Sequence, residues 1–167
     1  MPKIVILRGN SGSGKSTVAR LLQHRLGRGT LLISQDVVRR EMLWVRDGGG
    51  NASIPLLIDL VRYGRMHCEY VILEGILDAS CYHSLFSVIA EEFAENIYAY
   101  YYDLPFDETL RRHQSKPNHA DFGETDMRLW WKEKDYIGFI PETTLTAEID
   151  ADMAIKHILS HLEFCPL

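Results

Sequence analysis

The chain has 167 residues, of which 46% are hydrophobic, and its formal net charge is −5 at pH 7. This length fits one domain, residues 1–167, and the apolar fraction is large enough for a buried core. Disorder as a class is therefore excluded. The negative charge argues against broad nucleic-acid binding, although Arg111, Arg112 and Lys116 lie close together in the sequence.

The sequence predicts neither export nor a membrane span. Its first three residues are followed by only four apolar ones, which is too few for the core of a signal peptide. No apolar stretch approaches the ~20 residues that a membrane helix needs. The three cysteines, Cys68, Cys81 and Cys165, match no zinc-site spacing. We therefore expect a cytoplasmic protein with reduced thiols.

Predicted strands alternate with predicted helices along the chain. Short apolar runs predict strands at residues 4–7, 30–34, 70–73, 97–102 and 143–149. Amphipathic patterns predict helices at residues 15–26, 37–44, 53–66, 80–95, 105–114, 125–136 and 151–161, with Ser53 capping the third. This alternation predicts an α/β fold with three α/β/α layers and a five-stranded parallel sheet.

Ligands of such folds bind at the carboxyl ends of the strands, so the polar residues that follow the strands are candidates for chemistry. These residues are Arg8, Asp36, Glu74, Asp103 and Asp150.

A phosphate-binding loop follows the first predicted strand. The segment Gly9-Asn-Ser-Gly-Ser-Gly-Lys-Ser16 matches G-x-x-x-x-G-K-[ST] at every required position and opens a predicted helix. Backbone N–H groups and the positive end of that helix are suited to bind the phosphates of ATP. Lys15 is expected to reach the β and γ phosphates, and the Ser16 hydroxyl to bind Mg²⁺. The predicted nucleotide-binding residues are Gly9, Asn10, Ser11, Gly12, Ser13, Gly14, Lys15, Ser16 and Thr17.

Other motifs narrow the class of P-loop protein. The sequence contains no N/T-K-x-D element of guanine-specific switches and no L-S-G-G-Q signature of transporter ATPases. It is also too short to carry the helical lid of the large ATPases. The small-molecule kinases remain.

Asp36 and Glu74 are the candidate acidic residues of the site. Asp36 follows the second strand in a D-x-x-R pattern with Arg39, where a carboxylate can take the proton of an attacking hydroxyl. The alternative is that Asp36 only caps the following helix. Glu74 ends the third strand, as a Walker B acid does, and is expected to hold Mg²⁺ with Ser16 or to bind the acceptor. Its alternative is a solvated acid, and Gly75 is expected to let the acceptor approach the backbone.

Three elements together resemble the P-loop kinase superfamily: the phosphate loop, S-x-D-x-x-R from Ser34 to Arg39, and V-I-L-E-G from Val71 to Gly75. The chain is most similar to the nucleoside-kinase-like group of 5′-hydroxyl polynucleotide kinases, chloramphenicol phosphotransferases and zeta toxins. This resemblance implies that Asp36 is the base, with a weaker role for Arg39. It also implies ATP as donor, an acceptor cap at residues 37–66 and a short lid at residues 111–128. A lid arginine, either Arg111 or Arg112, would clamp the phosphates, and the adenine would lie near residues 149–152.

The acceptor is less well defined. The cap carries Arg39, Arg40, Arg46, Arg62 and Arg65. These arginines indicate either an acceptor with a phosphate or carboxylate, or merely a solvated helix face. We expect Trp130 and Trp131 to pack within the lid helix and not to form a stacking platform.

The sequence thus predicts an ATP- and Mg²⁺-dependent kinase with Asp36, Lys15, Arg39 and Arg112 as catalytic residues and a hydroxyl of a small molecule as acceptor. Two alternatives stay open: a kinase of 5′-hydroxyl nucleic acids, and a nucleotide-binding regulatory ATPase without a small acceptor. The sequence names neither the acceptor nor the oligomeric state, and the preference for ATP over GTP comes only from the resemblance.

Overall fold

The computed structural model describes residues 1–115 and 122–163. Its five strands form one parallel sheet in the order β2-β3-β1-β4-β5. The strands are β1 Lys3–Gly9, β2 Leu31–Ser34, β3 Tyr70–Gly75, β4 Ile97–Tyr102 and β5 Glu142–Leu145. The predicted five-stranded parallel sheet is therefore confirmed.

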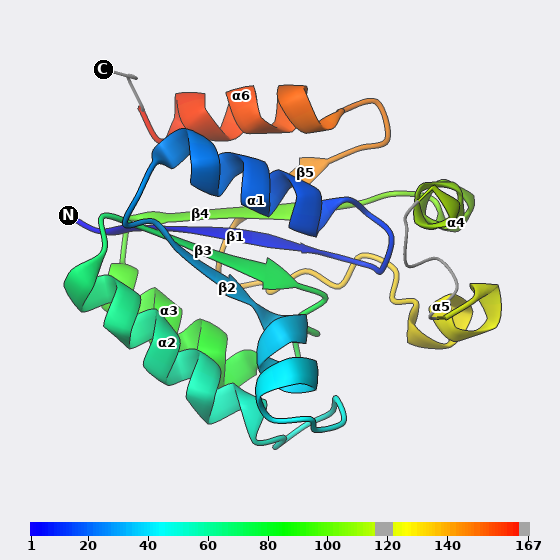
Figure 1. Ribbon diagram of the computed structural model, residues 1–167, viewed down its shortest axis with the longest axis horizontal. Helices are drawn as coiled ribbons and strands as arrows, with labels where there is room; N and C mark the ends of the chain where they lie inside the picture. Colours follow the sequence, from blue (N-terminus) through cyan, green and yellow to red (C-terminus); the bar gives the residue numbers. More distant parts are fainter. Residues whose placement is uncertain (116–121, 164–167) are drawn as a thin grey trace.

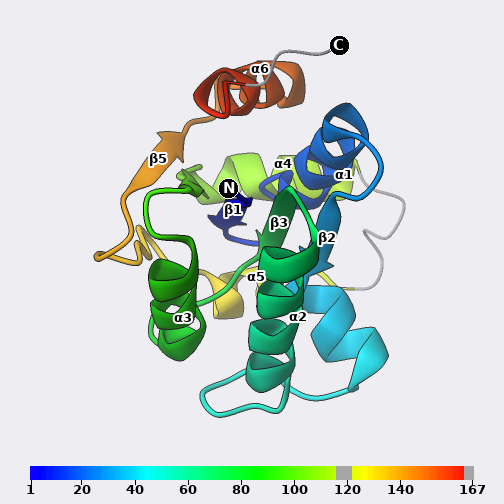
Figure 2. The same cartoon turned by 90° about the vertical axis from the view of Figure 1, so that its left-hand side faces the viewer.

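Helices cover both faces of the sheet, as Figures 1 and 2 show, so the predicted three layers are also confirmed. On one face lie α1 Lys15–Leu26 and α6 Ala151–His161, and on the other α2 Ser53–His67 and α3 His83–Phe93. Beyond the carboxyl ends of the strands lie α4 Phe106–Gln114 and α5 Glu124–Trp130 (Figure 1). A short π-helix, η1 Val37–Met42, follows β2. None of the helices in the described ranges is long and apolar enough to cross a membrane.

The central strand β1 contributes to both halves of the core. Ile4 and Ile6 pack into the cluster that includes α2 and α3, whereas Val5 and Leu7 pack into the cluster that includes α1 and α6. All four side chains are fully buried. Because β1 pairs with β3 and β4, the loop after it lies at the middle of the carboxyl edge.

The predicted helix at residues 125–136 ends six residues earlier, at Trp130. The cause is Asn10 of the phosphate loop, whose amide binds both backbone groups of Lys132. The Lys132 N–H donates to Asn10 Oδ1 at 2.9 Å, and Asn10 Nδ2 donates to the Lys132 carbonyl at 2.6 Å. A continuing helix would use those two groups internally, so the chain leaves the helix and runs past the loop.

The predicted end of the last strand and the predicted cap of α2 are also wrong. The last strand ends at Leu145 because a turn follows, in which the Ile149 N–H donates to the Thr146 carbonyl at 3.1 Å. Ser53 does not cap α2: its N–H and its hydroxyl both donate to Asn51 Oδ1, which therefore satisfies the start of the helix.

Arg8 at the end of β1 lies inside the fold. Its side chain is fully buried, and it forms ion pairs of 2.8 Å with Asp135 and Glu142. Its Nε and Nη2 also donate to the Leu77 carbonyl at 3.0 and 2.8 Å. Two aromatic rings flank the guanidinium, Phe86 and Tyr101. Arg8 thus ties β1 to β5 and to the chain that precedes β5.

Candidate active site

The phosphate loop connects β1 to α1 and keeps its lysine folded back over it. Gly14 has a φ of +96°, which an L-residue rarely adopts, and directly precedes the helix. Lys15 Nζ donates to the Asn10 carbonyl at 2.8 Å and to Ser13 Oγ at 3.1 Å. The first N–H groups of α1 have no partner within the helix. This end of α1 can therefore bind phosphate oxygens.

Gly12 is needed because α4 approaches the loop closely. A Cβ at Gly12 would lie 2.4 Å from the Thr109 carbonyl oxygen of α4. Its φ of +80° also disfavours any other residue. The sequence motif leaves this position unspecified, so the need for glycine here comes from tertiary packing.

Glu74 lies beside the loop and is held by two hydroxyl groups. Ser16 Oγ donates to Glu74 Oε2 at 3.0 Å, and Ser34 Oγ donates to Oε1 at 2.5 Å. Glu74 is only 5% exposed, which does not fit the alternative of a solvated acid at the strand end. A buried carboxylate next to a hydroxyl at a phosphate-binding loop fits Mg²⁺, which takes one or two protein oxygens besides phosphates and water.

The expectation that Gly75 lets an acceptor approach the backbone is wrong. A Cβ there would lie 2.7 Å from the Cβ and 2.8 Å from Oε1 of Gln35. Gly75 instead allows β3 to pack against the buried Gln35, whose amide donates to the Tyr82 hydroxyl at 2.8 Å.

Asp36 lies just before η1, with its side chain 56% exposed. It accepts no capping hydrogen bond from this helix, so the interpretation of Asp36 as a cap alone is wrong. Its carboxylate contacts Arg39 Nη2 at 2.9 Å and Arg40 Nε at 3.5 Å. One oxygen therefore faces two guanidinium groups, and the carboxylate remains accessible.

Arg39 anchors Asp36 to the chain that follows η1. Its side chain is 12% exposed, and Nη1 donates to the Val45 carbonyl at 3.4 Å. Its Nε lies 3.9 Å from Asp47 Oδ2 without a hydrogen bond. Asp47 in turn accepts a hydrogen bond of 2.7 Å from the Tyr82 hydroxyl. This arrangement fixes the direction of the Asp36 carboxylate.

A cavity of about 390 Å³ opens beside Asp36 and reaches the phosphate loop at Ser11. Its wall is mostly charged, with one large aromatic ring from α5. Residues of the wall include Arg39, Arg40, Arg46, Asp78, Trp130 and Lys132. Trp130 thus reaches this cavity, whereas Trp131 packs edge-on against Phe106 with ring centres 5.2 Å apart. We call this space the Asp36 cavity.

Sequence reasoning missed that Lys132 lines the Asp36 cavity and that Asn10 holds its backbone there. The Lys132 side chain forms an ion pair with Asp78, and both residues line the Asp36 cavity. Its backbone is fixed by the Asn10 amide, from a position 122 residues away in the chain. Asn10 was predicted only as one member of the phosphate loop, and no sequence signal indicates its distant partner.

We expect Asn10→Asp to destabilise the protein by about 1–3 kcal/mol. The substitution keeps the shape but points a carboxylate oxygen, in place of the N–H donor, at the Lys132 carbonyl. Urea unfolding followed by circular dichroism measures the change, and Ser11→Ala in the same loop is the control. A midpoint of Asn10→Asp equal to that of the wild type would show that the Asn10–Lys132 contact does not stabilise the fold.

A second cavity, of about 330 Å³, extends from Ser13 and Gly14 to the chain between β5 and α6. Its wall includes Thr17, Val18, Tyr102, Arg112, Ile149 and Asp150. Asp150 also caps α6, since its carboxylate accepts from the Met153 N–H at 2.8 Å. We call this space the Tyr102 cavity. Asp103, the remaining candidate at a strand end, lines neither cavity.

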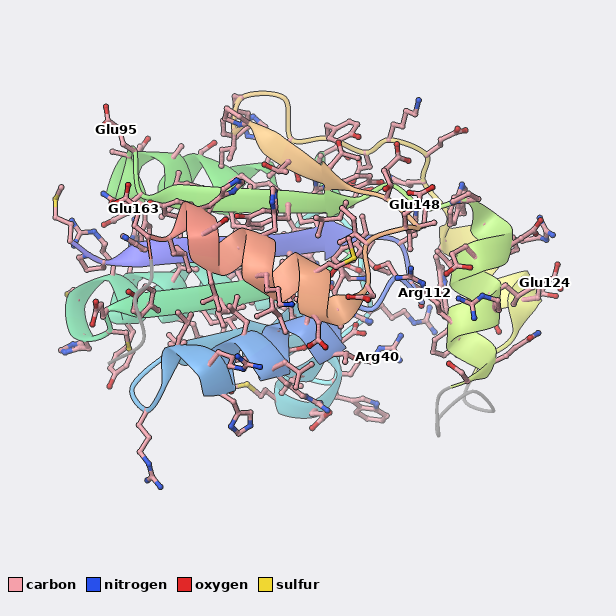
Figure 3. The ribbon with its side chains drawn as sticks, turned by 90° about the horizontal axis from the view of Figure 1, so that it is seen from above. Arg40, Glu95, Arg112, Glu124, Glu148 and Glu163 are labelled. Atoms are coloured by element: carbon pink, nitrogen blue, oxygen red, sulfur yellow. The ribbon has the colours of Figure 1, made fainter. Side chains whose placement is uncertain are left out.

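Arg112 and Arg111 differ sharply in position. Arg112 extends from α4 towards the chain after β5 (Figure 3) and donates to the carbonyls of Ser13 at 3.0 Å and Ala147 at 3.2 Å. Its Nε donates to Glu108 at 2.6 Å. Arg111 is 72% exposed and contacts Glu108 from the outside. Hydrogen bonds from Arg111 and Arg112 lower the pKa of Glu108 to about 2, so this acid stays charged at neutral pH.

Arg128, which lies in the expected lid, lines neither cavity. Arg128 pairs with Glu124 at 2.7 Å and lies over the Phe106 ring, 4.1 Å from its centre. Lys116 and part of the predicted lid, residues 116–121, lie outside the described residues.

Comparisons with known proteins agree on the fold. The Deinococcus radiodurans tunicamycin resistance protein superposes with a TM-score of 0.68 at 16% identity, over 98% of this chain and 97% of that one. The Mycobacterium tuberculosis APS kinase, solved with AMPPNP and APS, gives 0.66 at 21% identity over 98% of both chains. A gluconokinase from Sinorhizobium meliloti 1021 gives 0.64 at 14% identity, over 97% and 92%.

Comparison of the sequence with protein families is also informative. No curated protein matches the chain. The family model described as an AAA domain (AAA_33) matches residues 4–129, which is more than half of the chain. The chain therefore belongs to this AAA domain family, and its fold is the one shared by the small P-loop kinases.

Proposed function

We propose that this chain is a Mg²⁺-dependent kinase that transfers the γ-phosphoryl group of ATP to a hydroxyl of a small acceptor. One observation carries the proposal: Asp36 lines a cavity that also includes Ser11 of the phosphate loop. A carboxylate there can accept the proton of a hydroxyl that attacks the γ-phosphorus. The bond from that phosphorus to the ADP oxygen breaks as the new one forms.

The residues around the loop suit the other parts of this reaction. Lys15 and the N–H groups at the start of α1 would bind the phosphates and balance their charge. Ser16 and Glu74 would hold Mg²⁺, which supplies further positive charge to the phosphates when it is bound. Arg39 would keep Asp36 directed at the acceptor, which is supported by the 2.9 Å ion pair between the two.

The Tyr102 cavity is the proposed site of the nucleoside. The three nitrogens of Arg112 each make a hydrogen bond or ion pair in the plane of the group. Because Arg112 also lines the cavity, its guanidinium would stack on the base there. Such an Arg112 would act chiefly in nucleotide binding. The segment Val37–Met66 would serve as the acceptor cap and residues 111–128 as the lid, of which 116–121 lie outside the described residues.

Arg112→Ala is expected to weaken ATP binding about 10- to 100-fold, from the loss of stacking and of charge-assisted hydrogen bonds. Arg111→Ala, the neighbouring change on the exposed side of α4, is expected to stay within about twofold of the wild type. Isothermal titration with AMPPNP and Mg²⁺ measures both. Equal losses in the two variants would contradict the assignment of Arg112 to the nucleotide.

The charges of the Asp36 cavity favour an acidic acceptor. The wall carries four basic and three acidic side chains. Arg40 pairs with Asp36 and Lys132 pairs with Asp78, whereas among the described residues no ion pair includes Arg46, which supplies the excess positive charge. Guanidinium groups bind carboxylates and phosphates with two parallel hydrogen bonds. We therefore propose that the acceptor carries a carboxylate or a phosphate besides its hydroxyl.

A 5′-hydroxyl nucleic acid stays the second candidate because Trp130 reaches the same cavity and can stack on a base.

The proposed function is tested by measuring ATP consumption with Mg²⁺ across matched acceptors: sugars and sugar phosphates, nucleosides, aminoglycosides, phenicols and 5′-hydroxyl oligonucleotides. Stimulation by an acidic small acceptor supports the proposal, whereas stimulation by oligonucleotides alone supports the second candidate. Nucleotide binding without stimulation would favour a regulatory ATPase.

A further inference from the structure

Tyr102, a residue of the Tyr102 cavity wall, carries a buried hydroxyl without a hydrogen-bond partner among the described residues. Tyr102 is the last residue of β4 and is 2% exposed, and its phenolic oxygen makes no hydrogen bond to any described residue. Other tyrosines of the core differ in this respect. Tyr100, two residues earlier on the same face of the sheet, bonds to His161 Nδ1 at 2.8 Å.

Such a group destabilises the folded state, because the hydroxyl loses its hydrogen bonds to water on folding and forms no new one within the protein. Unpartnered buried polar groups are rare in native proteins, and a bound ligand is one explanation for them. The neighbours of Tyr102 in the cavity wall are the start of α1, Arg112 and the chain at Ile149–Ala151.

The position of Tyr102 within the cavity suggests which part of a nucleotide it meets. Phosphates bind at the loop and the first N–H groups of α1, from Gly12 to Ser16. The cavity continues from there past Thr17 and Val18 to Ile149. A nucleotide whose phosphates lie on the loop would therefore place its ribose and base in the part of the cavity that Tyr102 lines.

The chemistry of the phenol suits this ligand. Burial raises the pKa of Tyr102, so the hydroxyl stays protonated at all physiological pH values and can donate. It can also accept one hydrogen bond. Ring nitrogens, exocyclic groups and ribose hydroxyls of a nucleoside are all suitable partners.

We propose that the Tyr102 hydroxyl is a nucleoside-binding group, which forms its missing hydrogen bond with the ribose or base of the bound nucleotide. This inference rests on the proposed nucleotide site. It adds Tyr102 to the residues of that site. No sequence motif indicates this residue, because the run Tyr100-Tyr101-Tyr102 does not show which of the three hydroxyls lacks a partner.

The test compares Tyr102→Phe with Tyr100→Phe. Each variant removes only the phenolic oxygen of its tyrosine. Without ligand, Tyr102→Phe is expected to raise Tm by about 2–4 °C, since it removes an unsatisfied buried group. With ATP and Mg²⁺, it is expected to raise Kd about 3- to 10-fold. Tyr100→Phe is expected to lower Tm, because it removes a hydroxyl that bonds to His161, and to leave the Kd for ATP unchanged.

Inorganic triphosphate is the second probe, because it occupies the phosphate loop but has no nucleoside. Its Kd is expected to be equal in the wild type and in Tyr102→Phe. Unchanged ATP affinity in Tyr102→Phe would overturn the inference, as would an equal loss for triphosphate. If the wild-type protein binds neither ATP nor triphosphate, it is the proposed nucleotide site that fails, and the two failures are thereby distinguished.

Discussion

Asp36→Asn is expected to lower acceptor-dependent phosphoryl transfer by about 10²- to 10⁴-fold, the usual contribution of a general base. The amide keeps an oxygen that can contact Arg39, so the local arrangement should persist. It lacks the basic lone pairs that take the proton from the acceptor hydroxyl. The loss should therefore appear in kcat, because neither the nucleotide nor the acceptor loses a binding contact of comparable strength.

Nucleotide binding separates this role from a structural one. Asp36 lines the cavity that begins at Ser11 and does not line the one that begins at Ser13. The Kd for AMPPNP with Mg²⁺ should therefore stay within about twofold of the wild type. Asp59→Asn, which removes an exposed acid of α2, is the control for nonspecific effects of charge. Full turnover in Asp36→Asn, or lost nucleotide binding in a folded variant, would count against Asp36 as the base.

Local sequence patterns were sufficient to predict the sheet and the loop. The continuous apolar run at Ile4–Leu7 predicts a strand buried on both faces, and the structure confirms a central strand. The sequence places Ser16 and Glu74 at ends of elements that the parallel sheet brings together. Their contact at 3.0 Å depends further on β1 and β3 being neighbours and on the course of the phosphate loop, which the structure provides.

The parts that sequence reasoning missed depend on partners far along the chain. Asn10 binds Lys132 over 122 residues, and Arg8 binds Glu142 over 134 residues. No motif links the two members of either pair. Asn10 and Arg8 were candidates only because of the phosphate loop and the strand end, and nothing in the sequence marks Lys132 or Glu142 as their partners. Arg111 and Arg112 were also indistinguishable, because neighbouring positions of a helix point about 100° apart and the direction of α4 is set by tertiary packing.

Arg8→Met is expected to reduce the free energy of unfolding by about 3–5 kcal/mol, the range for breaking one side of a buried ion pair. Asp135 and Glu142 would keep one backbone donor each, from the N–H groups of Ala79 and Ile137. Their negative charge would have no counterion, and the Glu142 side chain is only 1% exposed. A typical domain has about 5–15 kcal/mol of stability, so this single change would consume a large part of it.

Urea unfolding at several pH values tests this cause. An unpaired buried carboxylate has a raised pKa in the folded state, so it destabilises the variant at high pH and ceases to do so once it is protonated. The deficit of Arg8→Met relative to the wild type should therefore shrink as the pH falls from 8 to 5. A deficit independent of pH would mean that lost packing against Phe86 and Tyr101, and not the unpaired charge, is responsible.

Arg62→Met is the matched control, because Arg62 pairs with Glu92 at 3.2 Å on the surface, with half of its side chain exposed. Water screens such a pair, and its loss is expected to cost less than about 1 kcal/mol. The comparison of Arg8→Met with Arg62→Met also tests the site. Arg8 directly precedes Gly9 of the phosphate loop and ties β1 to Asp135 and Glu142, in the segment that follows Lys132. If Arg8 supports the site in this way, Arg8→Met should weaken nucleotide binding even at temperatures where it remains folded, whereas Arg62→Met should not.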